Sequence, residues 1–436
     1  MAQERLIFHI DVDSAFLSWE AVRRVRRGEP DLRLIPSAVG GDPKSRRGII
    51  VAKSIPAKKF GVTTGEPVAM ALKKCPELVL VKSDFRLYSR CSKAFKDICR
   101  EYAPAVEEFS IDECFLDFTG TSKIYPDPIA LAYEIKDRIR DELGFTVNVG
   151  VARNKLCAKM ASDFEKPDRV HTLWPEEVET KMWPLPVRDL LFVGKKSAER
   201  LNGGGIRTIG DLAQADPRYL RSLLGEKMSV QARNYANGID NAPVRSEPEE
   251  AKGYSNEVTL EDNVTERGTA ETILLELADH VTARMRRDGA KAGCVAVSVR
   301  YLDFKTRSHQ RILAAPTDIS REVFEIAREL LAELWNGEPL RLMGVALTQL
   351  TREDGEGQNE QLSFFGDDMF GNPADSTESG ARKIDREKER KLDAAMDELR
   401  NRFGSGAIQR GGAMAMGIRV ARKASGQSDA ERDEES

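Results

Sequence analysis

The chain of 436 residues is too long for one compact core, and because a domain averages roughly 150 residues we expect about three domains. Hydrophobic residues make up 41% and charged residues 32%, which is typical of a soluble globular protein and excludes a disordered chain. There is no apolar run of about 18 residues and no signal peptide, so we expect a cytoplasmic protein without a membrane partner. The six cysteines lack paired short spacings, so we expect neither a zinc site nor disulfides.

The net charge of −4 argues mildly against a nucleic-acid partner, because phosphate-binding proteins usually carry a basic excess. Basic residues nevertheless cluster, notably at 284–291 and 300–311, whereas acidic residues gather at 247–250 and from Asp429 onward. These clusters indicate either a basic face on an acidic body or ordinary solvated surface.

The first 102 residues alternate between apolar and helical patterns. Residues 5–12 form a short apolar run that predicts a buried strand, and the pattern predicts a helix over 15–27. The Gly-, Pro- and Arg-rich segment 37–48 reads as a loop before a second strand at 49–53. Helical spacing returns over 87–102.

The next elements complete a recognisable order. Residues 107–118 alternate and predict a hairpin, 129–144 an amphipathic helix, 145–152 a strand and 155–164 a helix. Strand, helix, hairpin, helix and strand in this order predict a split βαβ sheet with helices on one face.

The remainder predicts two further regions and a tail. Residues 182–241 are helical and glycine-punctuated, as in paired helical hairpins, and 246–253 has the composition of a linker. A second α+β region follows, with strands near 254–260, 293–302, 306–314 and 341–350 and helices near 267–288 and 319–335. Residues 353–436 predict a flexible tail that contains a charged helix at about 381–403.

Three acidic residues stand at the ends of apolar strands, Asp11 after the first strand and Asp112 and Glu113 at the hairpin. Carboxylates from adjacent strands can hold two metal ions about 3.5–4 Å apart, as nucleotidyl transfer requires. Few carboxylates, completed by water and phosphate, are the ligands that Mg²⁺ prefers. Otherwise they are ordinary strand-end and turn acids. Asp13 either supports this site or caps the following helix.

Several ordered motifs together resemble Y-family DNA polymerases, close to the DNA polymerase IV type. They are HIDVDSAF, AKSIPAKKFGV, EEFSIDECFLDF and VGVARNKLCAKMASDFEKP, followed by a glycine-hairpin region, and the resemblance covers residues 5 to about 350. It implies a multidomain α+β fold shaped like a right hand, with a ferredoxin-like palm, small fingers, a helix-hairpin-helix thumb and an α+β little finger. The implied ranges are palm 1–20 and 79–178, fingers 21–78, thumb 179–242, linker 243–253, little finger 254–352 and tail 353–436.

The resemblance implies template-directed, low-fidelity DNA synthesis past lesions, without proofreading. Asp11, Asp112 and Glu113 would bind two Mg²⁺ ions with help from the Val12 carbonyl. Phe16 matches the steric gate that rejects ribonucleotides; on pattern alone, core packing explains it equally well.

Two lysines match the family's triphosphate-binding positions. Lys159 resembles the triphosphate-binding lysine, although without the family context it would read as a surface lysine. In the fingers the chain has Ile55 and Lys58 where the family usually has Tyr and Arg. Lys58 supplies a point charge but lacks the bidentate guanidinium fork, so both roles are open.

DNA and clamp contacts are implied further along the chain. Amides around Gly194 and Lys195 would bind phosphates without reading sequence. Strands of the little finger would grip the duplex through Arg300, Lys305, Arg307 and Arg311. A short peptide resembles the segment that docks on the bacterial sliding clamp, or is a strand end packed on the preceding domain: Gln361, Leu362, Ser363, Phe364 and Phe365.

The expected partners are therefore primer-template DNA, deoxynucleoside triphosphates and the clamp, and we expect a monomer. Two other functions stay open: a catalytically weak clamp-binding scaffold and a palm-fold nucleotidyl cyclase. Retention of all three carboxylates disfavours the scaffold, and the thumb-like hairpins have no role in a cyclase.

Overall fold

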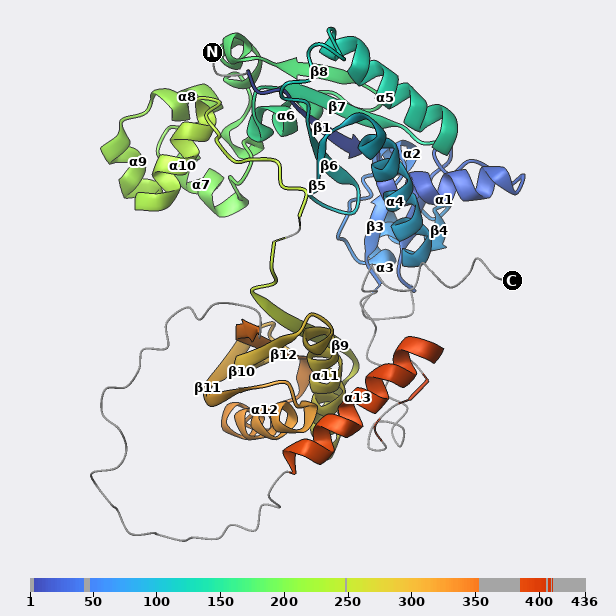
Figure 1. Ribbon diagram of the computed structural model, residues 1–436, viewed down its shortest axis with the longest axis vertical. Helices are drawn as coiled ribbons and strands as arrows, with labels where there is room; N and C mark the ends of the chain where they lie inside the picture. The colour runs from blue at the N-terminus through green and yellow to red at the C-terminus, as the bar shows by residue number, and fades with distance from the viewer. Residues whose placement is uncertain are drawn as a thin grey trace. The chain divides into compact units, whose positions relative to one another are not determined.

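The computed structural model describes residues 4–42, 48–247, 249–352, 385–404, 407, 408 and 410 (Figure 1). The chain divides between Glu249 and Glu250 into two compact units, called here the first and the second unit. The division falls within the segment 243–253 that the sequence predicts as a linker.

A five-stranded sheet forms the centre of the first unit. Its order is β5 (Ala105–Glu108), β6 (Glu113–Asp117), β1 (Ile7–Val12), β7 (Val147–Ala152) and β8 (Val170–Leu173). The central strand β1 is antiparallel to both β6 and β7, while β7 and β8 are parallel. The predicted hairpin at 107–118 and the strands at 5–12 and 145–152 are confirmed.

Helices cover both faces of this sheet, so the prediction that they lie on one face is wrong. On one face α4 (Phe85–Tyr102) and α5 (Pro128–Leu143) pack against even-numbered residues of β1, and α1 (Ala15–Arg26) joins the same core. On the other face lies α6 (Lys155–Ser162). The reason is Gly150 in β7, where a Cβ atom would stand 1.9 Å from the carbonyl oxygen of Ala158, so only glycine lets α6 approach so closely.

A smaller, three-stranded sheet in the first unit has the order β3 (Ile50–Lys53), β2 (Ser37–Gly40) and β4 (Val79–Lys82). The predicted loop 37–48 is therefore wrong at its start, because Ser37–Gly40 form the buried central strand. The Gly and Pro residues that follow hid this short strand from the sequence pattern. Two short helices, α2 (Ile55–Lys59) and α3 (Val68–Lys74), pack around the sheet.

The rest of the first unit is helical, as predicted for 182–241. Its elements are η1 (Pro175–Glu177), η2 (Val178–Met182), η3 (Val187–Asp189), α7 (Lys195–Gly203), α8 (Ile209–Gln214), α9 (Pro217–Leu224) and α10 (Glu226–Ala236). Local capping explains the short helices: Thr208 accepts from the backbone N–H of Asp211 at the start of α8, and the Asp216 side chain caps α9.

The second unit is a four-stranded antiparallel sheet with the order β11 (Thr306–Thr317), β10 (Ala290–Tyr301), β12 (Leu340–Arg352) and β9 (Gly253–Val264). Two helices, α11 (Arg267–Arg287) and α12 (Ser320–Leu334), share one core with it. The four strands and two helices predicted here are confirmed. The predicted charged helix at about 381–403 appears as α13 (Arg386–Phe403).

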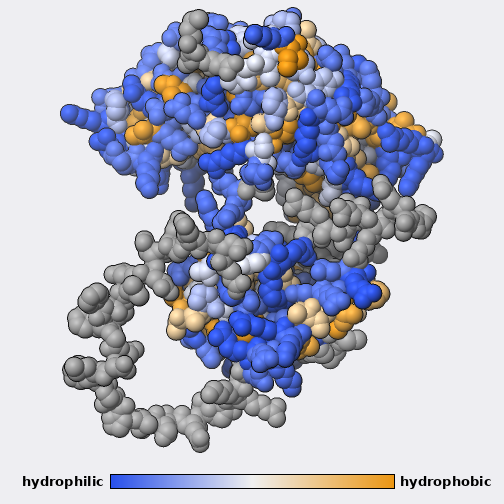
Figure 2. All heavy atoms as spheres, in the orientation of Figure 1, coloured by the Kyte–Doolittle hydropathy of each residue, from blue (hydrophilic) through white to orange (hydrophobic). Residues whose placement is uncertain are grey.

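One face of the molecule can be judged by the hydropathy of its residues. Figure 2 shows a mostly hydrophilic face on which hydrophobic residues are scattered. None of the described helices combines the length and apolar character that a membrane span requires.

Candidate active site

Three acidic residues from distant parts of the chain lie where β1 and β6 run side by side, and two of their carboxylates, those of Asp11 and Glu113, contact the same lysine. Asp11 on β1 stands directly opposite Glu113 on β6. One residue further, the backbone N–H of Val12 donates to the carbonyl of Asp112 at 3.0 Å. Asp11 is buried and the other two acids are partly exposed. The sheet thus brings together the predicted acids Asp11, Asp112 and Glu113.

Two lysine ammonium groups lie against these acids. Lys159 Nζ on α6 is 3.0 Å from Asp11 Oδ2 and 3.2 Å from Glu113 Oε1, while Lys166 Nζ is 2.9 Å from the same Asp11 oxygen. Asp163 pairs with both lysines. Burial alone would lower the pKa of Lys159, but the charges of Asp11, Asp163 and Glu113 raise it above its usual value. Lys159 is therefore a buried, charged residue and not a surface lysine.

Glu113 also faces a buried histidine. His9 Nε2 is 3.4 Å from Glu113 Oε2, and His9 Nδ1 is 2.8 Å from Ser162 Oγ. Burial opposes ionisation of Glu113, yet His9 and the charge of Lys159 lower its pKa to about 2. Burial lowers the pKa of His9 itself. Glu113 is thus an anion throughout the neutral range.

Asp13 supports the sheet and does not cap the helix. Its carboxylate accepts from Thr146 Oγ1 at 2.7 Å, from the Asn148 side-chain amide and from the backbone N–H of Asp168 at 2.9 Å. The residue before α1 is Ser14, which makes no side-chain cap. Of the two predicted roles for Asp13 the cap is wrong, because its oxygens are taken up in tying β1 to β7.

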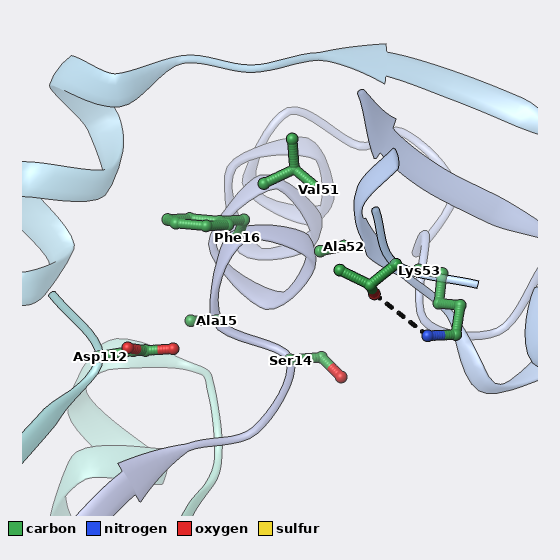
Figure 3. Close-up of a pocket in the computed structure, with 8 residues that line it drawn as sticks. Ser14, Ala15, Phe16, Val51, Ala52, Lys53 and Asp112 are labelled. Atoms are coloured by element: carbon green, nitrogen blue, oxygen red, sulfur yellow. Dashed lines mark hydrogen bonds between the residues drawn. The ribbon is translucent and has the colours of Figure 1, made fainter. Parts of the chain in front are cut away.

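A pocket of about 200 Å³ opens beside Asp112 (Figure 3). Asp112 Oδ1 accepts from Ser110 Oγ at 2.6 Å. Lys53, the last residue of β3, also lines the pocket. Its Nζ donates to Thr64 Oγ1 at 3.1 Å, which is the dashed line in Figure 3. The lining residues are Ser14, Ala15, Phe16, Val51, Ala52, Lys53, Thr64 and Asp112.

Phe16 packs against the aromatic core, as its position predicted, and also lines the pocket. Its ring packs on Tyr88 with centroids 4.7 Å apart and on Trp19 at 5.8 Å. The same ring is half-buried and lines the pocket (Figure 3). A side chain that is packed on one side and open on the other is suited to limit the size of a ligand.

The fingers residues predicted for triphosphate binding are exposed. Ile55 begins α2 with 62% of its surface exposed, and Lys58, also exposed, lies one turn later. Neither lines the pocket, whereas Lys53 does. Burial, and next the charge of Lys58, lowers the pKa of Lys53.

Sequence reasoning missed three residues of this site: His9, Lys53 and Lys166. His9 and Lys166 stand inside the motifs HIDVDSAF and ASDFEKP that carried the resemblance. His9 stands two residues before Asp11, and Lys166 stands three residues after Asp163. This spacing was the signal that could have identified both residues.

No group of three or more His, Cys, Asp or Glu side chains among the described residues is gathered closely enough to hold a metal ion. The oxygens of Asp11 and Glu113 instead contact the ammonium groups of Lys159 and Lys166. Carboxylate oxygens are the donors that a divalent cation such as Mg²⁺ takes, and here they already hold positive charge. The carboxylates of Asp11 and Glu113 thus have the donor chemistry of a divalent-cation site, and in this structure the two lysines occupy them.

The predicted DNA-contacting residues of the first unit lie at a helix start. Gly194 is the residue before α7, and a Cβ atom there would meet nothing within 4 Å. The side chain of Lys195 is 79% exposed. Both are accessible to a phosphate.

The four basic residues of the second unit that were predicted to contact DNA make different contacts within the protein. Arg300 Nε donates to Thr306 Oγ1 across β10 and β11, on the face away from the buried residues. Lys305 pairs with Asp303 at 2.9 Å, and the guanidinium of Arg307 lies over the Tyr301 ring. Arg311 pairs with Glu329 and Glu333 of α12. Arg307 and Arg311 stand opposite the buried Val299 and Val295, so both belong to the helix-covered face. The peptide 361–365 lies outside the described residues.

The fold is that of a Y-family DNA polymerase. A chimeric Y-family DNA polymerase superposes with a TM-score of 0.70 at 23% identity, covering 80% of this chain and 99% of that one. The DinB protein from Sulfolobus solfataricus gives a TM-score of 0.52 at 23% identity, covering 79% and 98%. The predicted right-hand, multidomain α+β fold is confirmed.

Sequence comparison identifies the family itself. Residues 10–163 match the impB/mucB/samB family, 251–364 its C-terminal domain and 175–206 the IMS family HHH motif. DNA polymerase IV of Clostridium acetobutylicum is 39% identical over 407 residues, 93% of this chain and 97% of the relative. DNA polymerase IV 1 of Bacillus subtilis is 35% identical over 412 residues, 94% and 93%. The chain belongs to the impB/mucB/samB family.

Proposed function

We propose how this protein, a DNA-directed DNA polymerase of the translesion type, performs nucleotidyl transfer. Asp11, Asp112 and Glu113, with the Val12 carbonyl, hold two Mg²⁺ ions. Bound metal lowers the pKa of the attacking primer 3′ hydroxyl and neutralises the triphosphate. The observation that carries this proposal is the pairing of Asp11 opposite Glu113, with lysine ammonium groups on both carboxylates.

The lysines bind the incoming deoxynucleoside triphosphate. Lys159 and Lys166 neutralise the carboxylates and are within side-chain reach of a phosphate at the same edge. Lys53 lines the pocket, and Lys58 adds positive charge on α2. Four ammonium groups around one site favour a polyanion over an uncharged nucleoside.

Phe16 acts as the steric gate against ribonucleotides. Its packing on Tyr88 and Trp19 holds the ring at the pocket wall, so an added 2′ hydroxyl would meet a fixed surface. Replacement Phe16→Ala should raise the ratio of ribonucleotide to deoxyribonucleotide incorporation, and an unchanged ratio would remove this assignment.

DNA is held by the backbone and by basic side chains. The N–H groups at Gly194 and Lys195 bind primer-template phosphates, and Arg300, Lys305 and Arg307 add contacts from the second unit. Arg311 is already neutralised by Glu329 and Glu333, so its share is smaller.

For the palm, fingers, thumb and little finger we keep the ranges that the resemblance implies, with one adjustment. Because β4 pairs with β2, the fingers extend to Lys82 and the palm resumes after it.

Residues 361–365 dock on a bacterial sliding clamp, and the protein works as a cytoplasmic monomer. Deleting 361–365 should cancel stimulation by the clamp while sparing basal extension.

Primer extension by acid variants tests the proposed mechanism. Asp112→Ala and Glu113→Ala should each abolish Mg²⁺-dependent extension. Asp117→Ala, at the other end of β6, is the matched control and should extend normally, since its side chain accepts from the Thr119 N–H. Extension at the control rate by the two site variants would reject the metal assignment and favour a clamp-binding scaffold. No finding favours a nucleotidyl cyclase.

A further inference from the structure

His9 is a fully buried polar residue that the mechanism above does not use. It precedes Asp11 by two positions on β1, so both side chains point to the face covered by α6. Its ring packs on Phe115 with centroids 4.5 Å apart. On its other side, the β7 residue paired with it is Gly150.

Gly150 brings α6 within reach of His9. A Cβ atom at Gly150 would stand 1.9 Å from the Ala158 carbonyl and 2.6 Å from the Ser162 nitrogen, so the helix rests directly on the strand. As a result Ser162 Oγ lies 2.8 Å from His9 Nδ1. Lys159, one turn earlier on α6, reaches Asp11 and Glu113.

The hydrogen bonds available to His9 fix which nitrogen faces the acid. Within the described part of the chain, Nε2 is buried without a hydrogen-bond partner and lies 3.4 Å from Glu113 Oε2. A lone pair facing a carboxylate is repulsive, so Nε2 carries a proton. In the neutral ring Nδ1 then accepts from the Ser162 hydroxyl, which turns away from the Lys159 carbonyl 2.8 Å from it. In the charged ring Nδ1 donates to Ser162 Oγ, and the hydroxyl keeps its hydrogen bond to that carbonyl. In either charge state Nε2 is a donor aimed at Glu113.

We propose that His9, held by Ser162, is a positioning residue that fixes the Glu113 carboxylate for divalent-metal binding. His9 occupies Oε2 and leaves Oε1, the oxygen that Lys159 Nζ contacts at 3.2 Å, to a cation. Donors behind a metal-binding carboxylate typically change metal affinity about 10–100-fold when removed. The inference rests on the metal role proposed for Glu113.

A plain structural role would need only the shape of the ring. His9→Phe keeps the ring and its packing on Phe115 but removes both nitrogens. His9→Gln places an amide N–H near the position of Nε2. Ser162→Ala leaves the ring in place and removes only the group that orients it. Ser229→Ala is the matched control, because Ser229 is also buried and its hydroxyl also donates to a carbonyl three residues earlier, at 2.9 Å.

Manganese binding to the full-length protein, without DNA or nucleotide, gives a readout independent of activity. We expect His9→Phe to raise the Kd for Mn²⁺, measured from the free-ion electron paramagnetic resonance signal, by about 10-fold or more. Ser162→Ala should raise it by a smaller factor, His9→Gln should recover part of the affinity and Ser229→Ala should equal the unchanged protein. The Mg²⁺ concentration for half-maximal extension should rise in parallel, with kcat largely restored at saturating Mg²⁺.

The outcomes separate this inference from the proposed function. Unchanged Mn²⁺ affinity in both His9→Phe and Ser162→Ala, while Glu113→Ala binds weakly, would overturn the role of His9 and leave the metal site standing. Unchanged affinity and extension in Glu113→Ala would instead overturn the metal site itself. If His9→Phe unfolds, Ser162→Ala and His9→Gln carry the test, and equal Kd values for these two and the unchanged protein would also overturn the inference.

Discussion

Each unit of the molecule contains a cluster of buried charge, and the two clusters use different cations. In the first unit, Lys159 and Lys166 pair with Asp11, Glu113 and Asp163. In the second, which we call the α13 cluster, arginines pair with aspartates between α11 and α13. Its members are Arg286, Arg400, Arg410, Asp279, Asp393 and Asp397.

The choice of cation matches what each cluster does. A lysine is a point charge on a flexible stem, so it can leave a carboxylate when another cation or a phosphate arrives. An arginine holds a carboxylate through a planar fork. Asp393 is 1% exposed and accepts from Arg286, Arg410 and the backbone N–H of Ser320 at 2.9 Å. Exchangeable charge thus lies beside a pocket, whereas fixed charge fastens a helix.

Of the variants considered, Asp11→Asn should give the largest change, and this change should affect activity and not stability. Losing one charged contact to the reacting groups costs roughly 10²–10³-fold in kcat, and we expect at least that in primer extension. The midpoint of thermal unfolding should shift little, because Glu113 still holds Lys159 and Asp163 still holds Lys166. A large loss of stability with intact extension would contradict the claim that this cluster serves activity and not stability.

Asp393→Asn should give the opposite pattern. Removing one partner from a buried ion pair destabilises by about 3 kcal/mol or more, and the second unit should unfold at lower denaturant with kcat unchanged. Asp397→Asn is the control: its side chain is 25% exposed and, among the described residues, forms an ion pair only with Arg286, so we expect a loss below about 1 kcal/mol. Equal effects of the two variants in denaturant melts would contradict the fastening role.

Lys159→Met tests whether the charge of this lysine is exchangeable in the active site. Removing the ammonium frees Glu113 Oε1, so Mn²⁺ should bind more tightly in the absence of nucleotide. Losing one charged hydrogen bond to the triphosphate should raise the KM for deoxynucleotide about 10-fold. Lys155→Met, on the same helix but paired with Glu107 at 2.6 Å, should change neither quantity. An unchanged KM in Lys159→Met would exclude triphosphate contact by this residue.

The smallest effect that we expect is a loss of stability in acid, caused by the α13 cluster. Burial alone would raise the pKa of Asp279, but the charges of Arg400 and Arg410 lower it below its usual value. A depressed pKa contributes stability above the unfolded value of about 3.9 that is lost as pH falls through the folded value. The second unit should therefore lose stability below about pH 4, and Asp279→Asn should flatten this slope in melts across pH. An unaltered slope would mean that Asp279 does not contribute.

Most helices and strands, and the three acidic residues proposed to bind metal, could be predicted from the sequence alone. Hydrophobic periodicity is a local property, so the strands holding Asp11 and Glu113, the helix 129–144 and the second α+β region could be predicted from it. Ordered motifs then predicted the family. The short strand Ser37–Gly40 was missed because four small residues before a Gly- and Pro-rich run carry no period.

Which charges meet could not be predicted from the sequence, because it depends on how distant elements pack. Lys159 and Asp11 are 148 positions apart, and their contact depends on α6 resting on Gly150. His9 gained a role from the Ser162 and Glu113 side chains that packing brought to it. The charged helix α13 was predictable, but its attachment through Asp393 to Arg286 was not. The physical reason is that a charge is read from sequence, while its partner is set by packing between elements far apart in the chain.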